Sequence, residues 1–412
     1  MTNKATAGTD YTTIEYWQRW MQSIPASYVV WKDGSTYRAE CQVKDGDDLS
    51  GTDAADVIQS AVDFLSSGGK IFLRRGIYEF GSAVDIPHGG IAIVGEAPPC
   101  DTIVGVEDSA NRVAVIRADG YEGITVNDND GDHDVYVTGV LLKNLILDGR
   151  DGGGEAAIRS WGRYVTIEDV IATSFNVGIS LEWTDEVSCG DSWLNRVVCR
   201  DNAYEGIKVQ SNDNQFTNIY SHYNQHGMLL KDKGGLLATN IHLWGNDDNG
   251  LKIVKSVNDH FLNLYTETNG DYGIFIGVLE GTVQNQKFMN IYSWGNTLGA
   301  IHIDGAGETL QNLTFLGGRV EGTVDYANIT NLTIDYVEGF VTRNNGSSTG
   351  TGAAQSFAHG FDGDLVPNDV TIVPTVSDTT VTNVWADATN IHCTVSTGKT
   401  YNWSAKKVGS LI

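Results

Sequence analysis

The sequence is poor in proline and cysteine, and both shortages narrow what the protein can be. Only 6 prolines and 5 cysteines occur in 412 residues, and no cysteines have the CxxC spacing of many zinc and redox sites. We therefore expect neither a disulfide framework nor a zinc site. No apolar run approaches the roughly 20 residues that a membrane helix needs, so we expect no membrane insertion.

Basic residues are also scarce. Against 27 Lys and Arg stand 52 Asp and Glu, which gives a formal net charge of -25. A nucleic-acid partner is not expected, because binding of that kind depends on neutralising phosphates. A halophilic source and a merely acidic soluble surface both remain open explanations of the charge. The first ten residues, MTNKATAGTD, contain no apolar segment of the signal-peptide type, so we expect synthesis in the cytoplasm without a cleaved signal.

What the sequence has in plenty is glycine, at 48 residues, and a repeat of about two dozen residues. One marker is an apolar residue, any residue, a polar residue and an aliphatic residue. Its polar positions are Asn144, Asp169, Arg196, Asn218, Asn240, Asn263, Asn290, Asn312 and Asn331. Two further markers recur in phase with it. One is a small residue before an aliphatic residue, as in Gly206-Ile207, and the other is a second series of Asn224, Asn246, Asn269 and Asn296.

A unit of this length cannot bury its own apolar face, whereas stacked units share one core at the strand spacing of roughly 4.8 Å. The repeat therefore predicts an all-β protein, a right-handed parallel β-helix of about nine or more coils. Asparagine tolerates the left-handed backbone of tight corners and can hydrogen-bond to the coil above it. We interpret the Asn columns as scaffold.

The segments outside the repeat suggest further parts. Residues 1–50 are expected to form an N-terminal attachment segment, with a hairpin over Tyr28–Cys41. The β-helix is expected to span 51–342, and a helix with an N-cap at Thr52 or Asp53 covers its entry. A Gly/Ser/Thr-rich linker is predicted at 343–354. Residues 355–412 read as a small C-terminal β-sandwich that serves as tip or trimerisation domain.

Two resemblances support this interpretation. GGKIFLRRGIY, from Gly68 to Tyr78, resembles the first-coil entry of the pectate-lyase-like superfamily of right-handed β-helices. The C-terminal pattern resembles the small β-sandwich tips of phage and archaeal-virus tail fibres. It is carried by Phe357, His359, Gly360, Pro367, Val370, Ile372, Pro374, Tyr401, Trp403 and Ala405.

Alternation along the strand after each repeat asparagine points Ile219, Ile241, Leu264 and Ile291 inward. The residues expected outside form a stripe that can stack on sugar rings and bond hydroxyls: Tyr220, His222, His242, Trp244, Tyr265, Glu267, Tyr292 and Trp294. Val198 and Arg200 are expected to extend the stripe at one end, and Thr314 and Leu316 at the other. A trimer interface or a loop-covered surface would also collect such rings.

Catalysis is undecided at this level. A glycoside hydrolase needs two carboxylates, and the candidates are Glu267, Asp247 and Asp248, with no motif to select a pair. A lyase would need a base, for which Lys208, Lys231 and Lys252 are candidates. No cofactor is required, although Asp128, Asp130, Asp132 and Asp134 alternate as in a loop that holds Ca²⁺ or another hard cation. An exposed acidic turn is the alternative.

The function that these features favour is that of a virion surface, tail-fibre or tailspike protein. It would be a homotrimer that binds a host-surface glycan or glycoprotein and contacts other virion proteins through its N-terminal segment. In one version of this hypothesis it also has depolymerase activity. The second hypothesis is a stand-alone polysaccharide lyase, hydrolase or epimerase of the pectate-lyase-like superfamily. The third is a purely structural trimeric spike.

Overall fold

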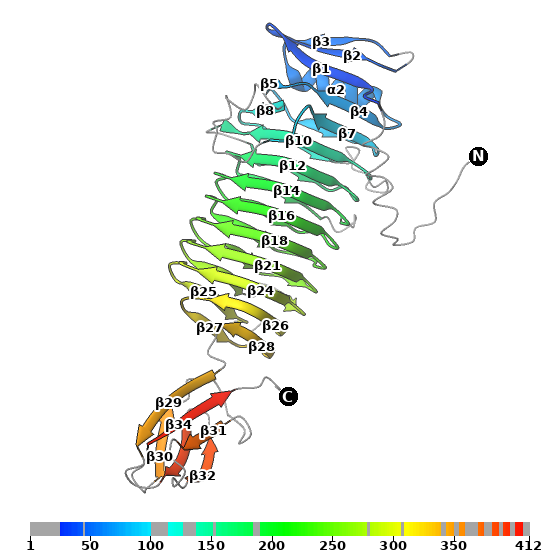
Figure 1. Ribbon diagram of the computed structural model, residues 1–412. Coiled ribbons are helices and arrows are strands. Elements are labelled where there is room, and N and C mark those ends of the chain that lie inside the picture. The colour runs from blue at the N-terminus through cyan, green and yellow to red at the C-terminus, as the bar shows by residue number, and fades with distance from the viewer. Residues whose placement is uncertain are drawn as a thin grey trace, which may run out of the picture.

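The computed structural model describes residues 25–43, 46–99, 114–126, 137–150, 154–183, 190–277, 281–305, 309–338, 343–349, 354–358, 370–374, 381–386, 390–395 and 400–406. Coils stack in register along one axis, from β10 (Leu141–Asp148) to β28 (Thr330–Glu338), as Figure 1 shows. All strand pairs between these coils are parallel, which confirms the expected parallel β-helix.

The larger sheet has 18 strands and forms one face of the β-helix. Its other strands within the coils are β4 (Gly69–Leu73), β5 (Gly76–Phe80), β7 (Ile91–Gly95), β8 (Ala114–Ala118), β12 (Thr166–Thr173), β14 (Trp193–Arg200), β16 (Gln215–His222), β18 (Leu237–Trp244), β20 (Ser256–Val257), β21 (His260–Glu267), β23 (Thr282–Gln284), β24 (Lys287–Trp294) and β26 (Thr309–Val320).

The smaller sheet has 10 strands and forms a second face. Its strands are β6 (Val84–Ile86), β9 (Ile124–Val126), β11 (Ala156–Ser160), β13 (Val177–Leu181), β15 (Glu205–Val209), β17 (His226–Leu230), β19 (Leu251–Ile253), β22 (Tyr272–Gly277), β25 (Gly299–Asp304) and β27 (Val324–Ala327). The small-aliphatic marker of the repeat begins these strands. Ile179 pairs with Ile207, and Ile207 with Met228, so the marker is in register from coil to coil.

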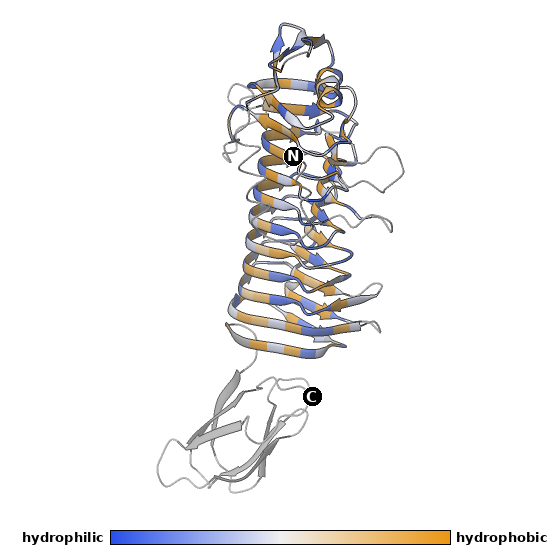
Figure 2. Cartoon of the chain, turned by 90° about the vertical axis from the view of Figure 1, so that its right-hand side faces the viewer, coloured by the Kyte–Doolittle hydropathy of each residue, from blue (hydrophilic) through white to orange (hydrophobic). Residues whose placement is uncertain are grey.

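The core lies between the two sheets. Apolar residues recur at matching positions of successive coils (Figure 2). Phe261, Phe288 and Phe315 stack along the axis with ring centroids 5.2 and 4.6 Å apart. Each ring therefore gains its partners from the coils above and below, which is why a single coil would have no stable core.

The N-terminal end is closed by helix α2 (Ala54–Phe64). Of the two residues expected to cap it, Asp53 is the N-cap and accepts a hydrogen bond from the backbone N–H of Ala55 at 2.8 Å. The apolar face of the helix, which includes Val57, Ile58 and Val62, is buried against the first coil. Among the described residues no helix is long and apolar enough to cross a membrane.

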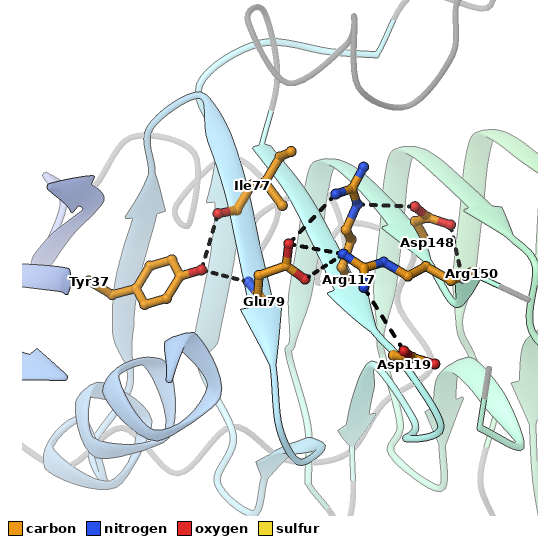
Figure 3. Close-up of polar contacts among 7 residues, drawn as sticks. All are labelled: Tyr37, Ile77, Glu79, Arg117, Asp119, Asp148 and Arg150. Carbon is orange, nitrogen blue, oxygen red and sulfur yellow. Dashed lines mark hydrogen bonds and ion pairs between the residues drawn. The ribbon is translucent and has the colours of Figure 1, made fainter. Parts of the chain in front are cut away.

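The predicted N-terminal hairpin consists of β1 (Tyr28–Asp33) and β2 (Thr36–Cys41), with β3 (Leu49–Gly51) pairing beside it. β1 also pairs in parallel with β4, so the sheet of the β-helix runs across the boundary expected at residue 50. The hydroxyl of Tyr37 ties the hairpin to β5 (Figure 3). It accepts from the backbone N–H of Glu79 at 2.9 Å and donates to the carbonyl of Ile77 at 3.4 Å.

The coils turn at residues in the left-handed conformation. All nine repeat positions, from Asn144 to Asn331, have φ between 53° and 61°. Asn240, Asn263 and Asn290 each donate through Nδ2 to the side-chain oxygen of the asparagine one coil earlier, at 2.7 to 3.0 Å. This ladder confirms the scaffold interpretation.

The expected order of the column is wrong at one point. Asn312 does not follow Asn290 but donates to Asn285 at 2.9 Å, and Asn331 donates to Asn312 at 2.8 Å. The residue next to Asn290 is Gly317, because Met289 pairs with Leu316. The 12-residue strand β26 spans two corners of the coil, so two ladders run side by side and the sequence spacing alone merges them.

The second Asn series lies inside the turn. Asn224, Asn246 and Asn269 are buried, and each donates to the side-chain oxygen of the next asparagine at 2.8 to 3.2 Å. Each also donates to a backbone carbonyl of the preceding coil. The series begins one coil earlier than predicted, at Asn202.

The C-terminal residues form two three-stranded sheets, as expected for a small β-sandwich. One sheet contains β29 (Arg343–Thr349), β34 (Thr400–Lys406) and β31 (Val370–Pro374), and the other contains β30 (Ala354–Ala358), β33 (Asn390–Val395) and β32 (Val381–Ala386). β29 occupies much of the segment expected to be a linker and pairs with β34 along its length.

Asp259 gives the β-helix a testable pH dependence. Its side chain is fully buried, and Oδ1 accepts from the backbone N–H of Leu236 at 3.0 Å. Burial raises the pKa of this carboxyl to about 6. The native state therefore gains its full stability from the uncharged carboxyl below about pH 4. This stability is lost as the pH rises through 6 and the buried group becomes charged.

We predict that Asp259→Asn raises the free energy of unfolding at pH 8 by roughly 1 to 3 kcal/mol and flattens the pH dependence between 4 and 7. Chemical denaturation at several pH values measures both effects. Glu40→Gln, which changes an exposed carboxylate on β2, is the matched control and should leave the profile as it is. An Asp259→Asn variant that is less stable than the parent at pH 8 would contradict the prediction.

Candidate functional site

Two outward-facing columns of side chains run along the larger sheet. The inward residues of the same strands are buried, as predicted for Ile219, Ile241, Leu264 and Ile291. The first column places Tyr220, His242, Tyr265 and Tyr292 on adjacent coils, and the second places His222, Trp244, Glu267 and Trp294 beside them. This is the predicted register. We name these eight side chains the aromatic stripe.

Ring contacts connect the stripe from coil to coil. Tyr265 and Tyr292 stack with centroids 4.9 Å apart and planes 7° from parallel. His242 meets Tyr265 edge to face at 4.6 Å and leans against Trp244 at 4.3 Å. Tyr220 contacts Trp244 edge to face at 6.1 Å. These geometries are the ones aromatic pairs prefer, so the rings hold one another in place.

Polar contacts fix the same rings. The indole N–H of Trp294 donates to the hydroxyl of Tyr265 at 2.7 Å, and Nε2 of His242 lies 3.1 Å from Oε1 of Glu267. Tyr220, Tyr292 and Trp294 nevertheless remain 36 to 38% exposed. The stripe therefore presents ordered rings to solvent on four adjacent coils.

His222 faces outward as predicted but is covered by its neighbours and only 9% exposed. Its ring stacks on Trp244 at 4.0 Å and meets the edge of Tyr223 at 4.9 Å. Burial, the charge of Arg200 and the nearby His242 lower the pKa of His222 to about 4. Burial likewise lowers the pKa of His242, against the opposing effect of Glu267. His222 is thus uncharged at neutral pH and holds Trp244 in place by stacking on its ring.

The C-terminal end of the stripe differs from the prediction. Thr314 and Leu316 do not extend it, because they pair with Lys287 and Met289 at the start of β24. The residue beside Tyr292 is Arg319, which forms an ion pair with Glu321 at 2.6 Å. The cause is strand β26, which spans two corners of the coil and thereby also separates the two Asn ladders. The rings therefore end against a charged pair.

Val198 and Arg200 are in register with Tyr220 and His222, as expected. Toward the N-terminus the two columns then change character, which the sequence did not reveal. The first becomes a buried aliphatic row of Val115, Ile146, Ile171 and Val198. The second becomes ionic (Figure 3). Arg117 lies 3.3 Å from Asp148 and 3.6 Å from Glu79, while Arg150 bonds to Glu79 at 3.1 Å. These charges compensate one another, and on these two columns the exposed rings are those of the four middle coils.

The catalytic candidates do not form one cluster. Glu267 belongs to the stripe and is bonded to His242. Asp247 and Asp248 lie in the turn before β19, where Asp247 is exposed and Asp248 accepts from Gln225 at 2.9 Å. No pair of carboxylates is thereby singled out for glycoside hydrolysis.

The three lysines are not one column either. Lys208 and Lys252 stand two coils apart in the outward row, with Leu229 between them, and Lys231 lies beyond the end of β17. The expected cation ligands Asp128, Asp130, Asp132 and Asp134 lie outside the described residues. Within the described ranges, no group of three His, Cys, Asp or Glu side chains has the geometry to hold a metal ion.

Comparison with known proteins establishes the fold. The profile of the family described as a right-handed β-helix region matches residues 156–316. A comparison with curated proteins found no similar sequence. Among solved structures, the N-terminal fragment of gene product 12 from bacteriophage Phi29 is 13% identical, with a TM-score of 0.54 over 70% of this chain and 55% of that one. The chain thus spans about half the length of that fragment.

Two other solved structures resemble this chain less closely. ORF18 of Geobacillus virus E2 is 16% identical, with a TM-score of 0.47 over 87% of this chain and 76% of that one. The tailspike gp49 of Acinetobacter baumannii bacteriophage Fri1, a capsular polysaccharide depolymerase, is 11% identical, with a TM-score of 0.43 over 85% and 81%. The family profile and the Phi29 fragment together identify the fold as a right-handed parallel β-helix.

The support that His222 gives to Trp244 predicts an acid-sensitive stripe. A folded-state pKa near 4, below the ordinary value of 6.5, means that neutral His222 contributes stability above pH 6.5, and that this contribution is lost as the pH falls through 4. We expect His222→Gln to unfold at a lower temperature than the parent at pH 7, and the difference to shrink at pH 4. Thermal melts at both pH values measure it. A difference that grows on acidification would contradict this role.

Proposed function

We propose that this right-handed parallel β-helix protein is a virion surface protein of the tailspike or tail-fibre type that binds carbohydrate on a host surface. The observation that carries the proposal is the aromatic stripe. Its rings are ordered by contacts across coils yet exposed at Tyr220, Tyr292 and Trp294. The shared fold of a bacteriophage protein, the Phi29 fragment, is consistent with it.

The chemistry of the stripe suits a glycan. Ring faces pack against the C–H faces of sugars, and the hydroxyl of Tyr265, the imidazole of His242 and the carboxylate of Glu267 offer hydrogen bonds beside them. Adjacent coils repeat the rings at roughly 4.8 Å. A saccharide chain along the axis would therefore meet a similar surface at each coil.

The second candidate function is a polysaccharide lyase, hydrolase or epimerase, either alone or as part of a tailspike. Glu267 is the carboxylate of the stripe, and its bond to His242 gives it a partner for proton transfer. A hydrolase would need a second carboxylate across the bound sugar. Release of reducing sugar, or ultraviolet absorbance of unsaturated products, from host envelope polysaccharide would separate an enzyme from a binding protein.

Assembly is the remaining part of the proposal. We propose a homotrimer, joined to other virion proteins through its N-terminal segment and clamped by the C-terminal β-sandwich. A purely structural trimeric spike differs from a receptor-binding trimer in where the stripe lies in the assembly. If the stripe is buried between subunits, its exposed rings are an interface and not a receptor site.

We predict that Tyr292→Ala and Trp294→Ala each weaken glycan binding about tenfold, or about 1.4 kcal/mol, because each removes a ring from the exposed surface. Binding is measured on an array of bacterial and archaeal surface polysaccharides and then by titration with the strongest one. Tyr121→Ala and Tyr204→Ala are matched controls, since both rings are about half exposed and lie off the stripe. Equal loss in the controls, or none in the stripe variants, would refute the proposal.

Light scattering after size exclusion tests the assembly. We expect a mass three times the 44.6 kDa of one chain, at working salt concentrations. The trimer should persist in Tyr292→Ala and Trp294→Ala if the stripe is a glycan surface. A monomer would reject the trimeric spike, whereas loss of the trimer in these variants alone would assign the stripe to the interface.

A further inference from the structure

A second cluster of rings lies on the smaller sheet, away from the aromatic stripe. Phe275 on β22, His302 on β25 and Asp325 on β27 are in register on three adjacent coils. Tyr272 begins β22, and Asp271 precedes it in the turn. We name these five side chains the acidic ring patch.

The rings of the patch pack face to face. His302 stacks on Tyr272 with centroids 4.9 Å apart, and on Phe275 at 5.2 Å, with planes within 28° of parallel in both contacts. Tyr272 and Phe275 are 6.3 Å apart. All three side chains are partly exposed. The patch therefore offers a compact aromatic surface over two coils.

Carboxylates border this surface on two sides. Asp325 Oδ2 lies 3.9 Å from Nδ1 of His302. Burial raises the pKa of Tyr272, and the charges of Asp325 and Asp271 raise it further, so both carboxylates act on the same hydroxyl. Burial and the neighbouring Asp248 also raise the pKa of Asp271, against the opposing effect of Lys252. Negative charge is thus concentrated where the rings are.

The nearby cation is already engaged. Lys252 is in register with Phe275 on the coil before it, and its Nζ lies 3.0 Å from Nε2 of buried His226. Around the rings the structure places three carboxylates, those of Asp248, Asp271 and Asp325, and the ammonium group of Lys252. The surplus is negative, and the patch is complementary to a cation.

We propose that the acidic ring patch binds a sugar that carries a free ammonium group, such as a deacetylated hexosamine unit. A cation over aromatic faces is attracted by their electron density, and a partly desolvated carboxylate adds a charge-assisted hydrogen bond. The pyranose body covers the rings. An N-acetylated sugar has the same body without the charge, so it lacks both interactions. The patch is separate from the aromatic stripe, and this proposal does not depend on the function proposed for the stripe.

The experiment compares two probes by isothermal titration: the β-1,4-linked tetramer of glucosamine and its fully N-acetylated counterpart, at a pH that keeps the amines protonated. The full-length protein should bind the amine form at least tenfold more tightly, and the preference should fall as salt is added. Asp271→Asn and Asp325→Asn should each reduce the preference several-fold. Equal binding of the two tetramers, or a preference for the acetylated one, overturns the proposal.

Two control variants and one further variant of the patch make the result specific. Glu40→Gln removes the same charge from an exposed position on β2 and should change nothing. If it weakens binding as much as Asp325→Asn, the tetramer is held by the general acidity of the protein, and the site is rejected. Tyr121→Ala removes an exposed ring that belongs to neither the stripe nor the patch and should keep the preference for the amine. Phe275→Leu keeps every charge of the patch and removes one ring, so it should weaken binding. It tests the patch independently if an Asp variant fails to fold. Unchanged binding in Phe275→Leu would count against the patch.

Discussion

The whole structure depends on the corner of the coil, where one residue adopts the left-handed conformation and hydrogen-bonds to the same position one coil earlier. That conformation costs roughly 1 kcal/mol or more for most residues and least for Asn and Gly. The corners at Asn240, Asn263 and Asn290 recover part of that cost through their side-chain ladder. Where Arg196 occupies a corner, ion pairs with Glu168 and Asp169 take the place of the amide bond.

Because corners stay aligned, every other position is aligned as well, and this is how the fold builds surfaces. A single ring at Tyr265 would be an ordinary exposed tyrosine. With Tyr292 stacked on one side and His242 on the other, it becomes part of a continuous face. The acidic ring patch arises in the same way on the other sheet, from Phe275 and His302. In both places the β-helix converts a repeat in sequence into a row in space.

The columns also show how one scaffold can hold different surfaces. The row that is aromatic at Tyr220 is aliphatic and buried at Val198, one coil earlier, and charged at Arg319, beyond Tyr292. The backbone is nearly the same throughout, so the difference resides in side chains that the coil does not need for folding. Outward positions are therefore where function can vary while the core and the corners persist.

The amino-acid sequence by itself determined the parallel coils, the capping helix, the hairpin and the inward and outward sides of the strands. Each of these depends on local periodicity or on a residue type with a strong conformational preference. The register through β26 needed the tertiary structure, because a coil of 27 residues can be aligned with its neighbour at either corner and only the packing of the strands selects one. Tertiary structure likewise decided that His222 supports Trp244 from below and that Asp271 and Asp325 meet around Tyr272. Burial and proximity across coils are properties of the stack, and no single repeat contains them.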